Sequence, residues 1–432
     1  MPDYKQQNNI AKQSATESLL VIGYVWPEPN SSAAGKHMLS LLKMFLQQGI
    51  DITFASPASL GEHKYDLTTL GIDEVSIALN CSSFDKFIEQ LNPNYVLFDR
   101  FMMEEQFGWR VAAQCPNALR ILDTEDLHFL RHARHQTQKK QHKNTSLLDC
   151  QNDIQQSDLA LREIAAIYRS DLTLIISQYE MNILTDDFSV PQCLLHYCPF
   201  MLELATRSKQ ALLYEQRQHF VSIGNFRHAP NWDAVLYLNN TIWPLIRKQL
   251  PDAELHVFGA YPPPKATQLH NPKKGFYVDG WVNDAQKMLE NARVLLAPLR
   301  FGAGLKGKLT DAMMTYTPSV TTSMGAQGMA EKVNWPGLIA DSPEAFAHAA
   351  TTLYSDAQQW RIASAKTTNI LCENFDFDIH AKALWQRITQ TKLRLTTHRL
   401  NNFTGRMLQH HSMKSTQYMA QWIEAKNRNK AT

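Results

Sequence analysis

One short stretch of the sequence reads RFGAGLKGKLTDAMM and concentrates groups that suit a bound anion. Gly302 and Gly304 let the backbone approach a ligand closely and adopt positive φ. Lys306 and Lys308 offer charges suited to phosphate oxygens at the start of a helix, whose dipole also favours anions. Asp311, about one turn farther on, is placed to accept hydrogen bonds from a ribose diol. The pattern indicates a diphosphate site, and a solvated loop before an ordinary helix start is the alternative.

Two further segments place similar groups directly after apolar runs. GNFRHAPN brings Gly224 and Asn225 and then Arg227, whose guanidinium can hold a phosphate with two hydrogen bonds. AAGKH places Gly35 at a helix start, close to where a ligand of a partner domain would reach. Both segments favour contacts with the same anion, although a simple helix cap also explains Gly35.

A fourth segment, LDTEDLH, gathers Asp123, Glu125, Asp126 and His128 at the end of an apolar run. Polar groups concentrated at such a place bind the hydroxyls of a sugar or assist proton transfer. Acidic residues before a helix are also common N-terminal caps, so the cluster has two explanations.

The elements that must position these groups alternate between strand and helix patterns. Runs such as SLLVIGYV and DLTLIIS predict buried parallel strands, and HMLSLLKMFLQQG has apolar residues at helical spacing before Gly49 ends the helix. A second alternating block opens at HFVSIG, so the sequence predicts two α/β halves joined near residues 196–210. Open parallel sheets bind ligands at the carboxyl ends of their strands. We therefore expect the four segments to meet in a cleft between the halves.

Composition sets the broad class. A chain of 432 residues favours two domains, and 44% hydrophobic with 19% charged residues is typical of a globular protein. No apolar run reaches the roughly 18 residues needed to span a bilayer, and residues 1–17 lack a secretory core. We expect these first residues to be disordered and the protein to be cytoplasmic. The six cysteines are scattered without metal-ligand spacing, so we expect free thiols and no metal site.

Basic segments suggest a further partner. From Lys392 to the end, the chain has eight Lys or Arg against Glu424 alone, and RHARHQTQKKQHK is a second basic stretch. Such clusters attract anionic lipid or an anionic polysaccharide acceptor, while a solvated surface is the alternative. Tyr418 and Trp422 among the cations would suit an interfacial helix, which suggests a peripheral position at the inner face of the membrane. The residues follow no RNA-binding pattern, so no nucleic-acid partner is expected.

The second half carries a family likeness. The glycine-lysine loop, the following Ala-Met helix, Pro318 and TTSMGAQGM occur in the order found in the group-1 glycosyltransferases of the family 4 type. The chain resembles that family over about residues 200–375, in the subgroup with a GxGxKxK donor loop. The first half resembles it less closely, through SSAAGKHMLSLLKMFLQQGIDITFAS and LREIAAIYRSDLTLIISQYEMNIL.

The resemblance implies a GT-B architecture, in which two Rossmann-like domains with parallel sheets face a central cleft and C-terminal helices are added. It places an acceptor-side domain over residues 18–200 and a nucleotide-sugar-binding domain over residues 201–378. A crossover helix and the basic tail then occupy residues 379–432.

The resemblance also implies a hexosyltransferase-like activity that moves a sugar from a UDP-type or GDP-type donor with retention of anomeric configuration. The acceptor would be a glycan, a lipid-linked molecule or another compound of cell-surface polysaccharide or glycoconjugate synthesis. No metal and no permanently bound cofactor are implied, because the nucleotide-sugar is itself a substrate.

The implied roles fall on the segments described above. Arg227 and Lys308 match the basic pair that neutralises the leaving diphosphate, with Lys306 close by. Asp311 matches the ribose-binding carboxylate, and Gly35 matches a glycine near the donor phosphates. Two residues of the first half match those facing the transferring sugar, and four more complete the donor contacts: Asp126, His128, Gly224, Asn225, Gly302 and Gly304.

One departure from the family pattern keeps other functions open. The family usually has two glutamates eight residues apart, but here the first position is Ala303 and the second is Asp311. An inactive subunit that binds a nucleotide or glycan for a partner enzyme is therefore an alternative, and a nucleotide-sugar epimerase on the same fold is another. The donor, the acceptor and the oligomeric state do not follow from the sequence.

Overall fold

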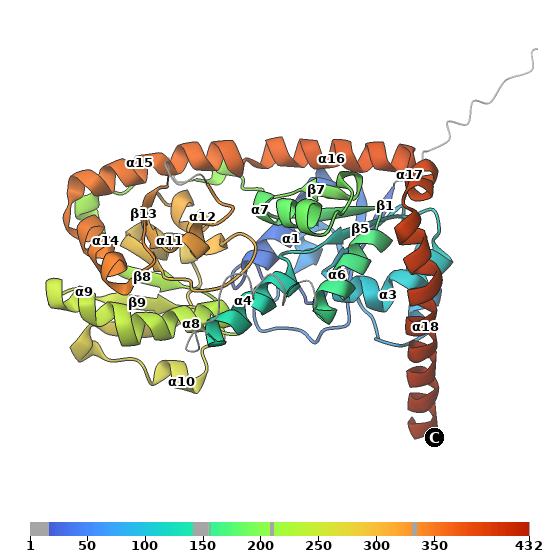
Figure 1. Ribbon diagram of the computed structural model, residues 1–432, viewed down its shortest axis with the longest axis horizontal. Helices are drawn as coiled ribbons and strands as arrows, with labels where there is room; N and C mark the ends of the chain where they lie inside the picture. Colours follow the sequence, from blue (N-terminus) through green and yellow to red (C-terminus); the bar gives the residue numbers. More distant parts are fainter. Residues whose placement is uncertain (1–16, 141–153, 155–156, 208–210, 331–334, 432) are drawn as a thin grey trace, which may run out of the picture.

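The computed structural model describes residues 17–140, 154, 157–207, 211–330 and 335–431, which form two α/β domains (Figure 1). The first domain holds a seven-stranded parallel sheet in the order β3-β2-β1-β4-β5-β6-β7. Its strands are β1 (Ser18–Ile22), β2 (Asp51–Ser56), β3 (Asp73–Ser76), β4 (Tyr95–Asp99), β5 (Leu119–Asp123), β6 (Leu172–Ile175) and β7 (Leu195–Tyr197). Its helices are α1 (Ala33–Gln47), α2 (Ser83–Leu91), α3 (Phe101–Gln114), α4 (His128–Lys140), α6 (Asp158–Arg169) and α7 (Gln178–Asn182).

The second domain holds a six-stranded parallel sheet in the order β10-β9-β8-β11-β12-β13. Its strands are β8 (Gln218–Ile223), β9 (Leu255–Phe258), β10 (Phe276–Gly280), β11 (Ala292–Ala297), β12 (Ser319–Thr321) and β13 (Gly337–Ile339). Its helices are α8 (Ala229–Tyr237), α9 (Trp243–Gln249), α10 (Pro264–Thr267), α11 (Ala285–Asn291), α12 (Gly307–Met314), α13 (Ser323–Ala326), α14 (Pro343–Ser355) and α15 (Ala357–Asn374). The predicted fold class is confirmed by these two Rossmann-like sheets.

The apolar run of β1 shows why continuous hydrophobic strands form the centre of the first sheet. Leu20 and Ile22 belong to the core on one face of the sheet, and Leu19 and Val21 belong to the core on the other. Because successive side chains of a strand point to opposite faces, a strand covered on both sides must be apolar throughout. Full burial of each such side chain contributes about 1.5–3 kcal/mol.

Helix α1 begins and ends as the sequence predicts. The Ser32 side chain caps its start by accepting a hydrogen bond from the Gly35 amide, and the apolar face containing Leu41 and Phe45 is buried. Gly49 follows the helix with φ of 72°, a left-handed conformation that favours glycine. The start of α1 is thereby fixed at the carboxyl end of β1.

The chain returns to the first domain through α16 (Phe377–Leu393). This helix begins two residues before the predicted start of the crossover segment. Its residues Ala381, Leu384 and Ile388 belong to the same hydrophobic core as Phe45. In Figure 1, α15 and α16 run along one edge of the molecule, α15 beside the second sheet and α16 beside the first.

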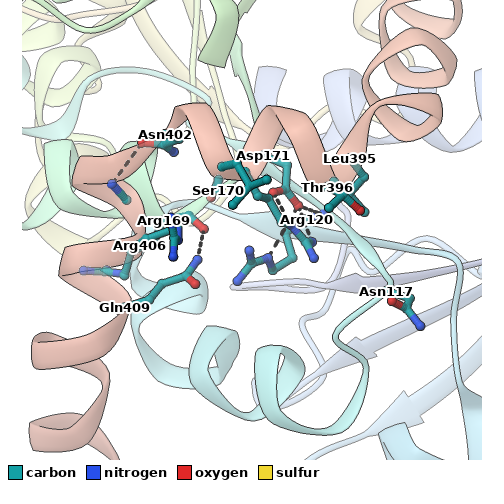
Figure 2. Close-up of a pocket in the computed structure, with 13 residues that line it drawn as sticks. Asn117, Arg120, Arg169, Ser170, Asp171, Leu395, Thr396, Asn402, Arg406 and Gln409 are labelled. Atoms are coloured by element: carbon teal, nitrogen blue, oxygen red, sulfur yellow. Dashed lines mark hydrogen bonds and ion pairs between the residues drawn. The ribbon is translucent and has the colours of Figure 1, made fainter.

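The basic tail folds into α17 (Leu395–Asn401) and α18 (Phe403–Ala431), which pack against the first domain. Figure 2 shows the polar contacts at this junction. Asp171 accepts hydrogen bonds from both the Arg120 amide and the Arg399 guanidinium, at 2.9 Å and 2.7 Å. Asn402 and Gln409 donate to main-chain carbonyls of the first domain. The tail is therefore an integral part of this domain.

Two expectations about the chain ends have structural outcomes. The prediction that residue 17 is disordered is wrong, because Glu17 accepts a hydrogen bond from Tyr95 and pairs with Lys392. Residues 1–16 and 141–153 lie outside the described residues, so the disorder expected for residues 1–16 stays a prediction. Arg131–Lys140 of the basic stretch belong to α4, and its last three residues lie outside the described part of the chain. Among the helices that the structure describes, none combines the length and the apolar character of a membrane span.

The Asp171 junction gives a stability prediction. Asp171→Ala leaves the buried Arg120 guanidinium without its ionic partner, so we expect the free energy of unfolding to fall by about 3–5 kcal/mol. Urea unfolding followed by tryptophan fluorescence measures the change. Glu215→Ala is the matched control, because Glu215 forms an exposed pair with Arg361 and its loss costs less than about 1 kcal/mol. Equal losses in the two variants would contradict the structural role of Asp171.

Candidate active site

A cavity of about 720 Å³ lies between the two domains and is lined by loops from both. The loops follow the carboxyl ends of β1, β4, β5, β8, β9, β10 and β11, where open parallel sheets bind ligands. All the residues predicted for the site line this cavity: Gly35, Asp126, His128, Gly224, Asn225, Arg227, Gly302, Gly304, Lys306, Lys308 and Asp311. The structure brings these side chains together, while their roles stay predictions.

The starts of α1 and α12 meet across the cleft. A Cβ atom added to Gly307 would lie only 2.5 Å from the Ala33 Cβ, so glycine is required at this close approach. The Lys36 ammonium lies 2.6 Å from an Asp311 carboxylate oxygen. Asp311, predicted to hold a ribose, is therefore paired with a lysine of the first domain. Any diol at this carboxylate must share it with Lys36 or displace Lys36.

Lys308 has an unusual environment for a lysine. Its ammonium donates to the Asn231 side-chain oxygen at 2.8 Å, and the Asn231 amide in turn donates to the Asn225 carbonyl. A Cβ at Gly224 would lie 2.8 Å from the Lys308 Nζ, so the absence of a side chain there makes room for the lysine. Burial, and after it the charge of Lys306, lower the pKa of Lys308 to about 7. Lys308 forms no ion pair with any residue that the structure describes.

Lys306 folds back onto its own loop. Its ammonium donates to the carbonyls of Gly304 and Ala303, at 2.6 Å and 3.2 Å. Burial lowers the pKa of Lys306 to about 8, against the opposing attraction of the Glu180 carboxylate. Both lysines of the loop are therefore desolvated, and the described residues supply neither with a direct carboxylate partner.

The loop that carries these lysines is held by side chains of the first domain. The Gly304 amide donates to Glu180 at 2.8 Å, and the Gly302 carbonyl accepts from Arg134 at 2.7 Å. His135 stacks on Phe301 with ring centroids 4.4 Å apart. Contacts with the first domain thus help to fix the conformation of this second-domain loop.

Glu180 links the loop to the acidic segment of the first domain. The same Glu180 oxygen that accepts from Gly304 also accepts from the Leu127 amide at 3.2 Å. The side chain is fully buried, and burial raises its pKa to about 7. Its second oxygen has no hydrogen-bond partner among the described residues. One carboxylate therefore fixes the relative positions of two loops from different domains.

Asp126 and His128 lie at the start of α4, on the first-domain side of the cavity. Asp126 forms an ion pair with Arg131, and the His128 Nε2 lies 3.5 Å from an Asp126 oxygen. Burial alone would raise the pKa of Asp126, but the charge of Arg131 and its hydrogen bond bring it below its usual value. Burial lowers the pKa of His128 to about 4, so the imidazole is neutral at pH 7. The pair presents a carboxylate and a neutral imidazole to the cavity.

A second buried glutamate positions this pair. Glu163 of α6 accepts hydrogen bonds from the main-chain amides of His128 and Phe129, at 3.1 Å and 3.0 Å. It thereby satisfies two of the unpaired amides at the start of α4. Burial raises the pKa of Glu163 to about 8. The sequence analysis missed this residue, although a glutamate inside the apolar pattern LREIAAIY is a usable signal.

Three more carboxylates gather on the first-domain side. Asp99 ends β4 beside Asp123 at the end of β5, and Glu125 follows with φ of 60°. Burial, and then the charge of Asp99, raise the pKa of Asp123 to about 7, and burial with Asp123 raises the pKa of Glu125 well above its usual value. Asp99 and Glu125 line the cavity. The cluster found from sequence is therefore larger than predicted, because Asp99 joins it from a neighbouring strand.

Arg227 lies apart from the two lysines, on an aromatic wall. Its guanidinium lies over the Tyr261 ring, 3.6 Å from the centroid, and the Tyr261 hydroxyl donates to Glu28 of the first domain at 2.8 Å. Next to it, His63 stacks on Trp281 with centroids 3.6 Å apart. These contacts also join the two domains, so Arg227 faces the cavity from a platform built by both.

Comparison with known proteins defines the class. A family model described as glycosyl transferases group 1 matches residues 217–356. This range runs from the residue before β8 to the residue after α14. No curated protein matches the sequence significantly.

Solved structures share the fold over both domains. A sucrose-phosphate synthase from Thermosynechococcus elongatus is 14% identical, with a TM-score of 0.63 over 87% of this chain and 98% of that one. TarM from S. aureus, in complex with fondaparinux, alpha-GlcNAc-glycerol and UDP, is 10% identical, with a TM-score of 0.66 over 86% and 100%. HepE from Anabaena, in complex with UDP and glucose, is 10% identical, with a TM-score of 0.64 over 86% and 99%.

The family match agrees with the predicted family over residues 217–356, which form most of the second domain. The two domains together have the GT-B fold of these solved structures.

Two substitutions of Glu180 separate the contribution of its hydrogen bonds to stability from the contribution of its negative charge. Glu180→Ala leaves two buried amides unsatisfied, each costing about 1–3 kcal/mol, so we expect a clear fall in the free energy of unfolding. Glu180→Gln keeps the accepting oxygen and should cause a smaller fall. Denaturant unfolding of the two variants measures the difference. Equal destabilisation by both substitutions would show that the negative charge matters more than the two hydrogen bonds.

Proposed function

We propose that this protein is a retaining glycosyltransferase that moves a sugar from a UDP-type or GDP-type nucleotide-sugar to a glycan, lipid-linked or similar acceptor. One observation carries the proposal. Lys308 is a desolvated lysine in the cavity whose only described partner is a neutral amide oxygen, so a diphosphate would supply the missing negative charge. Lys306 lies in the same loop with the same lack of an ion pair among the described residues.

The proposed mechanism places positive charge where negative charge develops. As the bond between the sugar and the diphosphate breaks, Lys306, Lys308 and Arg227 stabilise the leaving diphosphate, together with the dipole of α12. Preorganised charges in a desolvated cavity act more strongly than in water. In this proposal the three cations do this work without a metal, and the nucleotide-sugar enters as a substrate.

The remaining predicted residues take roles around the same substrate. Asp311 accepts hydrogen bonds from the ribose diol, after exchanging its contact with Lys36. Asp126 and His128 face the transferring sugar from the first domain. Gly224 and Gly304 allow close approach of the loops that contact the donor. The UDP in the TarM and HepE structures supports a nucleotide donor on this fold.

The proposal extends to cellular context. A role in cell-surface polysaccharide or glycoconjugate synthesis, in the cytoplasm and at the inner face of the membrane, fits the basic tail. Residues Lys414, Lys426 and Arg428 accompany the exposed Tyr418 and Trp422 on α18, a combination that suits an anionic surface.

A second candidate rests on Ala303. The family pattern has a glutamate there, but this position offers a methyl group next to the cavity. A subunit that binds a nucleotide without transferring sugar would keep the lysine site and lack turnover. Incubation with nucleotide-sugars and an acceptor panel, with and without added membrane extract, separates the two candidates. For an active enzyme, NMR of the product should show the anomeric configuration of the donor.

The lysine pair gives the first functional prediction. Calorimetric titration with UDP, GDP and ADP should show binding of one nucleotide class, and Lys306→Ala with Lys308→Ala should weaken it by at least about 100-fold, if two charge-assisted contacts of about 1.5–3 kcal/mol each are lost. Lys248→Ala, an exposed lysine of the same domain outside the cavity, is the control and should bind like the native protein. Unchanged binding by the double variant would remove the proposed diphosphate site.

The lowered pKa values give a second prediction. A lysine is cationic below its pKa, so at pH 8 Lys308, with a pKa of about 7, is mostly neutral in the free protein. A bound diphosphate raises this pKa, and binding at pH 8 should therefore take up a proton, with less uptake at pH 6. Calorimetry in buffers of different ionisation enthalpy measures the uptake. If Lys308→Met took up as many protons as the native protein at pH 8, another group would be responsible.

A further inference from the structure

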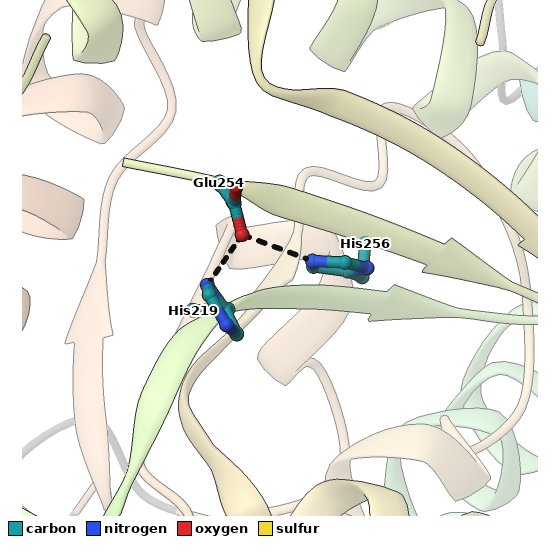
Figure 3. Close-up of side chains that lie close together, drawn as sticks. All are labelled: His219, Glu254 and His256. Carbon is teal, nitrogen blue, oxygen red and sulfur yellow. Dashed lines mark ion pairs between the residues drawn. The ribbon is translucent and has the colours of Figure 1, made fainter. Parts of the chain in front are cut away.

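A cluster of metal-ligating side chains lies outside the cavity, on the second sheet. His219 of β8, Glu254 just before β9 and His256 of β9 point toward one another (Figure 3). The His219 Nδ1 lies 3.1 Å from a Glu254 oxygen, and the His256 Nε2 lies 3.6 Å from the same oxygen. All three ligand atoms lie within 4.8 Å of one another. None of the three residues lines the cavity.

The sheet holds these side chains on one face. Val221 is paired in register with His256, and Tyr277 of β10 is paired with His256 on the other side. His219 lies two residues before Val221, with φ of 60°, and Glu254 lies two residues before His256, immediately ahead of β9. Adjacent parallel strands therefore present the ligands side by side, and the rigid sheet sets their spacing.

Residues around the cluster orient the ligands. The His256 Nδ1 lies 2.8 Å from an Asp279 oxygen, and because a carboxylate only accepts, this nitrogen carries the hydrogen. The His256 Nε2 is buried and has no hydrogen-bond partner among the described residues. The Tyr277 hydroxyl donates to the other Glu254 oxygen at 3.1 Å. A histidine held by a carboxylate, with its second nitrogen directed at other ligands, is the arrangement found around protein-bound zinc.

We propose that His219, Glu254 and His256 bind a Zn²⁺ ion, with water at the fourth position. Two imidazoles and one carboxylate are ligands that Zn²⁺ prefers, at bond lengths of about 2.0–2.2 Å. Tetrahedral ligands at that distance lie about 3.3–3.6 Å apart, close to the 3.1 Å and 3.6 Å that separate Glu254 from the two histidines. The Asp279 carboxylate then orients His256, and the Tyr277 hydroxyl orients Glu254.

The proposed ion has a structural role, because it lies far from the reacting groups. His219 is at the beginning of β8, whereas Gly224 follows its end, about 16 Å away at about 3.3 Å per residue. An ion between His219 and His256 would link β8 to β9 near their amino-terminal ends, whereas the cavity lies at the carboxyl ends of the strands. Because the unfolded chain does not hold these three ligands together, binding would stabilise the folded second domain.

The test uses the full-length protein after treatment with a chelator. Zn²⁺ titration against a competing chromophoric chelator should show one equivalent bound, and Co²⁺ should give the visible absorption of a low-coordinate site. Zn²⁺ should also raise Tm. The His219→Ala, His256→Ala double variant and Glu254→Gln should lose the bound equivalent, and Asp279→Asn should bind about 10–100-fold more weakly.

Matched controls separate this site from other histidines. His270→Ala changes a histidine near the cluster that packs against Tyr277, and His348→Ala changes an exposed histidine of the same domain. Both should bind Zn²⁺ as the native protein does, and circular dichroism checks that all variants fold. No stoichiometric binding by the native protein, or an equivalent that survives in the folded double variant or in Glu254→Gln, would overturn the proposal.

Discussion

The arrangement of the cavity depends on one buried carboxylate, Glu180 of the first domain, which accepts hydrogen bonds from loops of both domains. Glu180 accepts an amide from the loop before α4 and an amide from the loop before α12, so a single oxygen sets the distance between two functional segments. A buried acceptor with two donors is strongly directional, because leaving either amide unpaired costs a full desolvation penalty. The ion pair between Lys36 and Asp311 and the hydrogen bond from Tyr261 to Glu28 also connect the two domains across the cleft.

Both domains contribute acidic and basic side chains to the cavity. The first supplies Glu125, Asp126 and Arg131, and the second supplies Asp311 with Lys306, Lys308 and Arg227. Burial disfavours the charged form of both kinds of group, because it raises the pKa of Glu125 and lowers the pKa of Lys308.

Sequence alone predicted the parts of the site that depend on local rules. The loops of Lys308, Arg227 and Asp126 were found because each follows an apolar strand, and parallel strands bring such loops to one edge. Contacts between distant segments were not predictable: Lys36 lies 275 residues from Asp311. The ligands His219 and His256 were missed for the same reason, since only the register of two strands places them together. Ser177 caps α7 by accepting a hydrogen bond from the Glu180 amide, but this local pattern does not indicate that the Glu180 side chain contacts the second domain.

The return of α16 to the first domain has a consequence for how the protein is made. Leu384 and Ile388 fill the same core as Phe45, and Arg399 completes the charge balance of Asp171. The amino-terminal half emerges from the ribosome before residues 377–431, so the apolar side chains that α16 covers stay exposed until those residues have been synthesised. The first domain to be translated is thus the last to be completed, and its protection during synthesis depends on the second domain folding without delay.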